Sequence, residues 1–169
     1  MKETSLLNNI DVFNPFAGPD IERVIHTTPS QAEIWIACKL GDDNGNRGYN
    51  ESITLILKGS LNKEALSKAL KELVQRHETL RSVFSTDGRF MTIFKQLSLP
   101  LDHQDISKFS DSEKDRFLKN YLSGDANYVF DLVKGPLLKV ALIKLSETEH
   151  HLILTGHHIV CDGWSLGII

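Results

Sequence analysis

The chain has 169 residues, a length that fits one domain with a substantial core. Its formal net charge of -3 argues against nucleic acid as the main partner, and no apolar stretch is long enough to span a membrane. The N-terminus lacks the profile of a signal peptide, and two cysteines, Cys38 and Cys161, do not form a disulfide framework. These features predict a cytoplasmic protein.

Turn-forming residues dominate the start of the chain. Residues 1–24 carry Asn, Pro, Gly and Asp in a pattern typical of an extended leader or inter-domain linker. A first helix is predicted over 28–40, with Thr28 as its N-cap and Pro29 at its first position. The polar run at 41–48, GDDNGNRG, is typical of a loop.

The middle of the chain alternates strand and helix patterns. Ile53, Leu55 and Leu57 alternate with Thr54, Ile56 and Lys58, which predicts a strand. The clearest helix is expected over 63–80, capped by Asn62 and carrying an apolar stripe at helical spacing. Residues 82–96 are typical of a hairpin, with its turn at 87–88, Asp-Gly.

The second half follows the same pattern. Ser110 and Glu113 have capping-box spacing, which predicts a helix beginning near Ser110. Its expected inward face is Phe117, Leu118, Tyr121 and Leu122. Two strands are expected over 137–145 and 150–157, the second almost continuously apolar, as in a strand covered on both faces. The fold class predicted is a layered α/β (α+β) sandwich. The last residues, SLGII, begin a helix without a cap, so we expect the chain to be part of a larger protein.

The chemistry-bearing segment is His-His-Ile-Val-Cys-Asp-Gly-Trp-Ser at 157–165. Adjacent residues at a strand end point to opposite faces, so His157 and His158 are not expected to share a metal ion. One ring should face inward and the other a cleft. Asp162 either orients His158, as in a catalytic relay, or pairs with an arginine and holds the loop. We favour pairing with Arg76 or Arg81.

An imidazole suits base catalysis on an amine. Free imidazole titrates near about 6.5 and an α-ammonium near about 7.7–8.0, so proton transfer between them is roughly balanced at neutral pH. Amine attack on an acyl carbonyl fits this chemistry, with His158 as the base. Cys161 is a possible nucleophile, but a buried thiol that fills space is the favoured interpretation.

Four segments together resemble the condensation domains of nonribosomal peptide synthetases, in the wider chloramphenicol acetyltransferase-like clan. Residues 157–165 resemble the family's HHxxxDGWS signature, and RHETLRSVF at 76–84 is similar to its RHExLRTxF. FDLVKGPLLKVALIKL at 130–145 resembles the segment before the histidines. TPSQAEIW at 28–35 is similar to the first core motif, with Glu33 where Arg is usual. Gly156 also departs from the usual Met.

The resemblance implies that residues 25–169 form an N-terminal lobe of chloramphenicol acetyltransferase type, with a mixed β-sheet flanked by helices. The C-terminal lobe that closes the active-site tunnel is absent. His158 would act as base or positioner, forming an amide between a carrier-bound acyl or peptidyl thioester and a carrier-bound aminoacyl acceptor. The positions implied to support the motif or the loop are His157, Asp162, Gly163, Trp164, Ser165, Arg76 and Arg81.

Partners follow from the same resemblance. Substrates would arrive on the 4'-phosphopantetheine of peptidyl or acyl carrier proteins, and no cofactor or metal is expected to bind this lobe. The leader and the variant first motif suggest an upstream polyketide synthase module. Since half of the site is missing, we expect the isolated chain to be inactive.

Other functions remain open at this point. Heterocyclising members replace the histidine pair, and epimerising members differ after it, so the Gly-Trp-Ser at 163–165 favours condensation. A non-catalytic module that docks carrier proteins is the main alternative. A third is an acyltransferase that completes its site by oligomerising, with His158 facing a neighbouring subunit.

Overall fold

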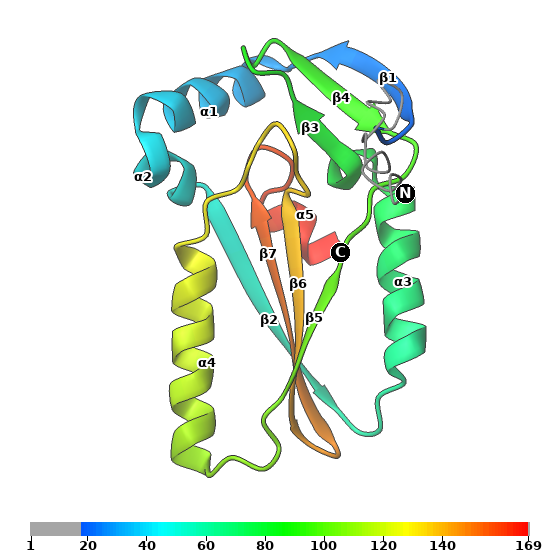
Figure 1. Ribbon diagram of the computed structural model, residues 1–169, viewed down its shortest axis with the longest axis vertical. Helices are drawn as coiled ribbons and strands as arrows, with labels where there is room; N and C mark the ends of the chain where they lie inside the picture. The colour runs from blue at the N-terminus through cyan, green and yellow to red at the C-terminus, as the bar shows by residue number, and fades with distance from the viewer. Residues whose placement is uncertain (1–17, 169) are drawn as a thin grey trace, which may run out of the picture.

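The computed structural model describes residues 18–168, which form two β-sheets and the helices around them (Figure 1). The strands are β1 Ile21–His26, β2 Asn50–Lys58, β3 Ser82–Phe84, β4 Phe90–Phe94, β5 Leu101–Asp105, β6 Leu138–Ser146 and β7 Glu149–His157. The helices are α1 Pro29–Leu40, α2 Asp42–Arg47, α3 Lys63–Arg76, the 3-10 helix η1 Glu78–Arg81, α4 Asp111–Ala126 and α5 Gly163–Ile168.

The main sheet has four strands in the order β2-β7-β6-β5. β7 pairs antiparallel with both β2 and β6, whereas β5 pairs parallel with β6, so the sheet is mixed. The register places Asn50 of β2 opposite His157 and Glu51 opposite Gly156. The start of β2 therefore lies beside the end of β7, where the histidine pair begins.

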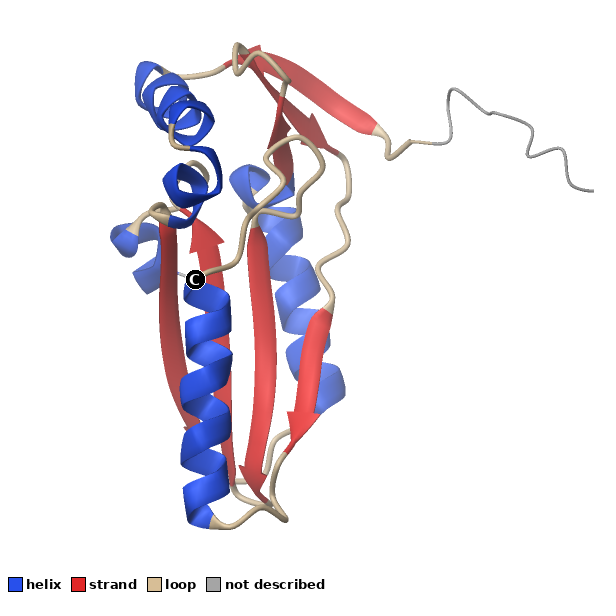
Figure 2. Cartoon of the chain, turned by 60° about the vertical axis from the view of Figure 1, so that its left-hand side comes forward, coloured by secondary structure: helices blue, strands red, loops and turns tan. Residues whose placement is uncertain are grey.

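Helices cover both faces of this sheet. Side chains alternate along β6, so Leu138, Val140 and Leu142 pack with Leu70 and Val74 of α3. On the other face, Ala141 and Ile143 pack with Phe117, Leu118 and Tyr121 of α4. Figure 2 shows α4 and α3 on the two sides of the strands. The predicted layered sandwich with a mixed sheet is confirmed.

The smaller sheet, β1-β4-β3, corrects the predicted leader. Residues 21–24, assigned to the leader or linker, belong to β1, which pairs antiparallel with β4. The backbone of Asp20 also accepts a hydrogen bond from Lys95, at 2.7 Å. The rest of the predicted leader up to residue 17 lies outside the described residues. The hairpin predicted over 82–96 is confirmed as β3 and β4.

Three other predictions need correction. The run at 41–48 contains helix α2, since Asp42 and Asp43 lie in its first turn and favour a helix N-terminus. The strong helix ends at Arg76 rather than at residue 80, and η1 follows it. Strand β5 was not predicted. Leu122, expected to point inward from α4, is 38% exposed.

A further apolar cluster joins α1, the β3–β4 hairpin and the segment after β7. Its buried members include Cys38, Phe84, Ile93, Ile159 and Leu166. This cluster packs the loop that carries the histidine motif against the rest of the fold. Within residues 18–168, no helix combines the length and apolar character needed to cross a bilayer.

Candidate active site

His157 is the inward-facing member of the pair. Its side chain is 0% exposed and packs edge-on against the ring of Phe130, at 5.9 Å between centroids. Its Nδ1 accepts a hydrogen bond from the backbone N–H of Ile159 at 3.2 Å, and its Nε2 lies 3.7 Å from Sγ of Cys38. Burial, reinforced by the nearby imidazole of His158, lowers the pKa of His157 to about 4. The ring is therefore neutral at physiological pH.

His158 points the other way. Its side chain is 45% exposed, while its backbone N–H donates to the carbonyl of Tyr49 at 2.8 Å. Its Nε2 lies 4.0 Å from Oε2 of Glu51. The expectation that the two rings face opposite sides is thus confirmed. His158 combines an accessible imidazole with a backbone fixed to Tyr49, the residue before β2.

The loop after His158 is held by its own backbone and by helix α1. The carbonyl of His157 accepts hydrogen bonds from the backbone N–H groups of Val160 at 3.0 Å and Cys161 at 3.3 Å. Gln31 of α1 donates from Nε2 to the carbonyl of Ile159 at 3.2 Å. The same Gln31 completes the capping box with Thr28 that starts α1. The side chain of Gln31 therefore takes part both in the cap of α1 and in holding the histidine loop.

Asp162 starts helix α5 instead of pairing with an arginine, so the predicted ion pair is wrong. Its Oδ1 accepts from the backbone N–H of Ser165 at 2.8 Å and from its hydroxyl at 2.6 Å. These two hydrogen bonds lower the pKa of the Asp162 carboxyl. Asp162 still holds the loop, but through a local N-cap.

The two arginines have other positions. Arg81 is 4% exposed and pairs with Glu22 of β1 at 2.6 Å, with a further hydrogen bond to the carbonyl of Phe94. It therefore ties η1 to the smaller sheet, which no local sequence signal revealed. Arg76 is exposed in the last turn of α3, and no ion pair joins it to Asp162 within residues 18–168.

Gly163 and Trp164 follow the cap. A Cβ at Gly163 would lie 2.8 Å from Oε1 of Glu51, so a side chain there would force that carboxylate to move. Trp164 is 81% exposed on α5, although tryptophan usually buries most of its ring. Ile168 on the same helix is 61% exposed. The outer face of α5 is thus apolar and uncovered among the described residues.

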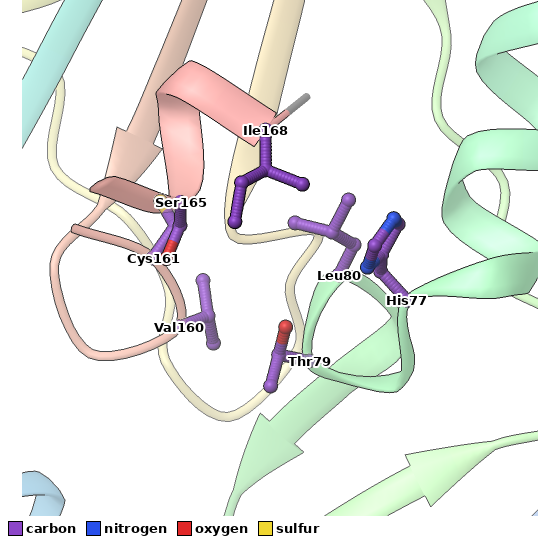
Figure 3. A pocket seen from close by; sticks show the side chains of 7 residues that line it. All are labelled: His77, Thr79, Leu80, Val160, Cys161, Ser165 and Ile168. Carbon is purple, nitrogen blue, oxygen red and sulfur yellow. The ribbon is translucent and has the colours of Figure 1, made fainter. Parts of the chain in front are cut away.

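The side chain of Cys161 points away from solvent. It is 4% exposed, and burial raises its pKa to about 11, with Glu51 and Asp162 acting in the same direction. A thiol held neutral is a poor nucleophile, so the space-filling interpretation is supported. Cys161 lines a cavity of about 110 Å³ between this loop and η1, together with His77, Thr79, Leu80, Val160, Ser165 and Ile168 (Figure 3).

The side chain of His158 does not line that cavity. The cavity is therefore not the place where this imidazole would meet a substrate. Within the described part of the chain, no group of three or more His, Cys, Asp or Glu side chains has a metal-binding arrangement.

A buried polar network supports β7 from the α4 side. Asp125 at the end of α4 is 4% exposed and pairs with Lys139 of β6 at 2.5 Å. Thr155 of β7 donates to the other carboxylate oxygen at 3.0 Å, and Ser52 of β2 lies 2.8 Å from the Thr155 hydroxyl. The network thus spans three strands, two residues before His157.

The sequence is similar to a defined family. The family model described as "Condensation domain" matches residues 21–169. The chain is 34% identical to chondramide synthase cmdD of Chondromyces crocatus over 147 residues, which cover 86% of this chain and 4% of that protein. It is 38% identical to malpibaldin synthetase of Mortierella alpina over 157 residues, which cover 88% of this chain and 3% of that protein.

Solved structures show the same fold. The first condensation domain of the calcium-dependent antibiotic synthetase, in complex with a substrate analogue, matches with a TM-score of 0.73 and 27% identity. The match covers 86% of this chain and 35% of that one. The starter condensation domain of rhizomide synthetase RzmA matches with a TM-score of 0.74 and 22% identity, over 84% of this chain and 35% of that one. The chain thus spans about a third of each solved chain.

Proposed function

Because the chain belongs to the condensation-domain family, we propose that it is the N-terminal lobe of an amide-forming acyltransferase in a nonribosomal peptide synthetase. The donor is an acyl or peptidyl thioester and the acceptor is an aminoacyl thioester, each on the 4'-phosphopantetheine of a carrier protein. The observation that carries this proposal is the 45% exposed imidazole of His158 on a loop fixed by Tyr49 and Gln31.

The reaction follows from an imidazole beside an amine. The acceptor nitrogen attacks the thioester carbonyl carbon, and a tetrahedral intermediate forms. His158 takes a proton from the attacking nitrogen as the C–N bond forms, or holds that nitrogen in line with the carbonyl. The C–S bond then breaks, the thiolate of the donor's phosphopantetheine leaves, and the proton is returned to it. General base catalysis of this kind typically contributes about 10²–10⁴-fold in rate.

The rest of the motif keeps His158 in place. The neutral ring of His157 uses Nδ1 to hold the backbone of Ile159, so the loop does not depend on a charge at that position. Asp162 fixes the direction in which α5 leaves the loop. His158 is thus the residue of the motif that we assign to the reaction, and its neighbours are supporting residues.

The uncovered face of α5 supports a second part of the proposal. Trp164 and Ile168 are exposed apolar side chains directly after the motif. We assign this face to the C-terminal lobe of the same domain, which would close a tunnel over His158. The folded lobe then begins at residue 21, where the family model starts, and the residues before it serve as a linker. An upstream polyketide synthase module is the neighbour that we assign to that linker.

Substitution of His158 by Ala within a complete condensation domain that contains these residues tests the proposal. Amide formation from carrier-bound substrates should fall by about 10²-fold or more, while binding of the carrier proteins should persist. Unchanged product formation would instead indicate a module that only docks carrier proteins. The 169-residue chain alone should form no amide product, since it lacks the surface that orients the acceptor. Activity of this chain as an oligomer would favour the acyltransferase that completes its site between subunits.

A further inference from the structure

Glu51 is a carboxylate outside the motif that lies beside the imidazole of His158. It lies at the start of β2, opposite Gly156, and its Oε2 is 4.0 Å from Nε2 of His158. This oxygen is buried and has no hydrogen-bond partner among residues 18–168. An unpaired buried acceptor costs about 1–3 kcal/mol, and more when it is charged. The arrangement is therefore unfavourable unless a donor reaches Oε2.

His158 is the donor in position to do so. It is the cation-forming side chain paired with Glu51 within the described residues, and the separation of 4.0 Å must shorten by roughly 1 Å for Nε2–H to donate to Oε2. Asp162, the carboxylate of the motif, uses its Oδ1 for the two groups of Ser165. Glu51 is the carboxylate that pairs with the imidazole of His158 among residues 18–168.

The fold also reserves space for this carboxylate. Position 163 is a glycine, and a Cβ there would stand 2.8 Å from Oε1 of Glu51. The backbone of Tyr49, two residues before Glu51, accepts the hydrogen bond from the N–H of His158. The short segment 49–51, which leads into β2, therefore contacts both the backbone and the side chain of the same histidine.

We propose that Glu51 is a positioning residue for His158. Its carboxylate accepts a hydrogen bond from Nε2–H, fixes that tautomer and leaves the lone pair on Nδ1 as the site that takes the proton of the acceptor amine. The imidazolium then formed keeps Nε2–H on Glu51, which stabilises its charge. This inference rests on the proposed role of His158 in amide formation.

The nitrogen resonances of the His158 ring provide a readout that does not depend on activity. In the 169-residue chain, at a pH where imidazole is neutral, a held ring shows one protonated and one unprotonated nitrogen. A free ring averages two tautomers. Wild type should show the Nε2–H form, and Glu51→Ala should move both resonances toward free histidine. Glu51→Gln keeps an acceptor oxygen without the charge and should retain the tautomer.

A matched control exists in the same sheet. Glu149 of β7 lies 3.6 Å from Nε2 of His151, so Glu149→Ala removes a carboxylate beside a different histidine. It should leave the His158 resonances unchanged. Gly163→Ala, which pushes on Glu51, should disturb them in the same direction as Glu51→Ala. Resonances of His158 that are identical in wild type and in a folded Glu51→Ala chain would overturn the inference.

Kinetics in a complete condensation domain separate this inference from the proposed function. Glu51→Ala should lower kcat by about 10- to 100-fold with little change in the KM for the aminoacyl carrier, as expected for a residue that acts through a base. If His158→Ala abolishes amide formation while Glu51→Ala changes neither kcat nor the tautomer, Glu51 has no positioning role and the proposed function stands. If Glu51→Ala frees the ring but His158→Ala leaves the rate unchanged, the proposed function fails instead.

Discussion

Acidification should destabilise the fold through one buried imidazole. Burial lowers the pKa of His157 to about 4, whereas an unfolded histidine has a pKa near about 6.5. The unfolded state therefore binds more protons between these two values, and the free energy of unfolding falls as pH decreases through this window. Linkage predicts a loss of about 2 kcal/mol between pH 7 and pH 5, and about 3 kcal/mol in total below pH 4.

Urea denaturation of the 169-residue chain at pH 7, 6 and 5, followed by far-UV circular dichroism, measures this loss. His157→Gln keeps a side-chain oxygen that can accept from the Ile159 N–H but binds no proton. The variant should be less stable at pH 7, yet lose about 2 kcal/mol less than wild type on going to pH 5. His150, whose pKa is also lowered by burial, titrates in both proteins, so its contribution to the pH dependence cancels in the comparison. Parallel losses in the two proteins would refute the assignment to His157.

Three further predictions concern residues around the motif. Asp162→Ala should lower the Tm by about 2–4 °C, as for a lost N-cap, and not by the roughly 10 °C that a broken buried ion pair would give. Asp125→Asn should destabilise the chain by about 2 kcal/mol in urea denaturation, because the hydrogen bond from the partly exposed Lys139 loses its charged acceptor. Cys161 should not react with a thiol reagent at pH 8 in the folded chain, since only about one thiol in a thousand is ionised there, and should react fully in urea.

Two of these predictions have a control variant in the same chain. Asp162→Asn keeps an acceptor for the cap and should leave the Tm nearly unchanged. Asp115→Asn, at an exposed position of α4, should alter stability by less than about 0.5 kcal/mol. A Tm loss near 10 °C for Asp162→Ala would restore the ion-pair hypothesis. Equal effects of Asp125→Asn and Asp115→Asn, or rapid labelling of the native Cys161, would contradict the other two.

The elements predicted well are those with a strong local signal. Helix α4 follows the capping box of Ser110 and Glu113, and β6 and β7 follow segments rich in apolar residues. Strand β5, LDHQD, has no apolar alternation and so gave no local signal. It forms a strand because α4 and β6, from elsewhere in the chain, supply its context. Strand β1 was missed because turn-forming residues precede it. Its partner β4 also comes about 70 residues later, so no local signal marks the pairing.

The site shows the same division between local and distant information. The alternation of side chains along a strand predicted that His157 and His158 face opposite sides, but only the packing shows which of them is buried. The Asp162–Ser165 spacing is a local N-cap signal and could have replaced the arginine hypothesis. Glu51 had no such signal, because its proximity to His158 arises from the register of β2 against β7.

The hydrogen bond from Gln31 to the carbonyl of Ile159 joins residues 128 positions apart. A chimera of two related chains needs a crossover point. A crossover anywhere between these two residues would take the histidine loop from one parent and its anchor on α1 from the other. The hydrogen bond between Tyr49 and His158 adds the same constraint from the residue before β2. Chimeras that inherit 28–165 as one block should therefore retain the loop geometry more often than those divided inside it.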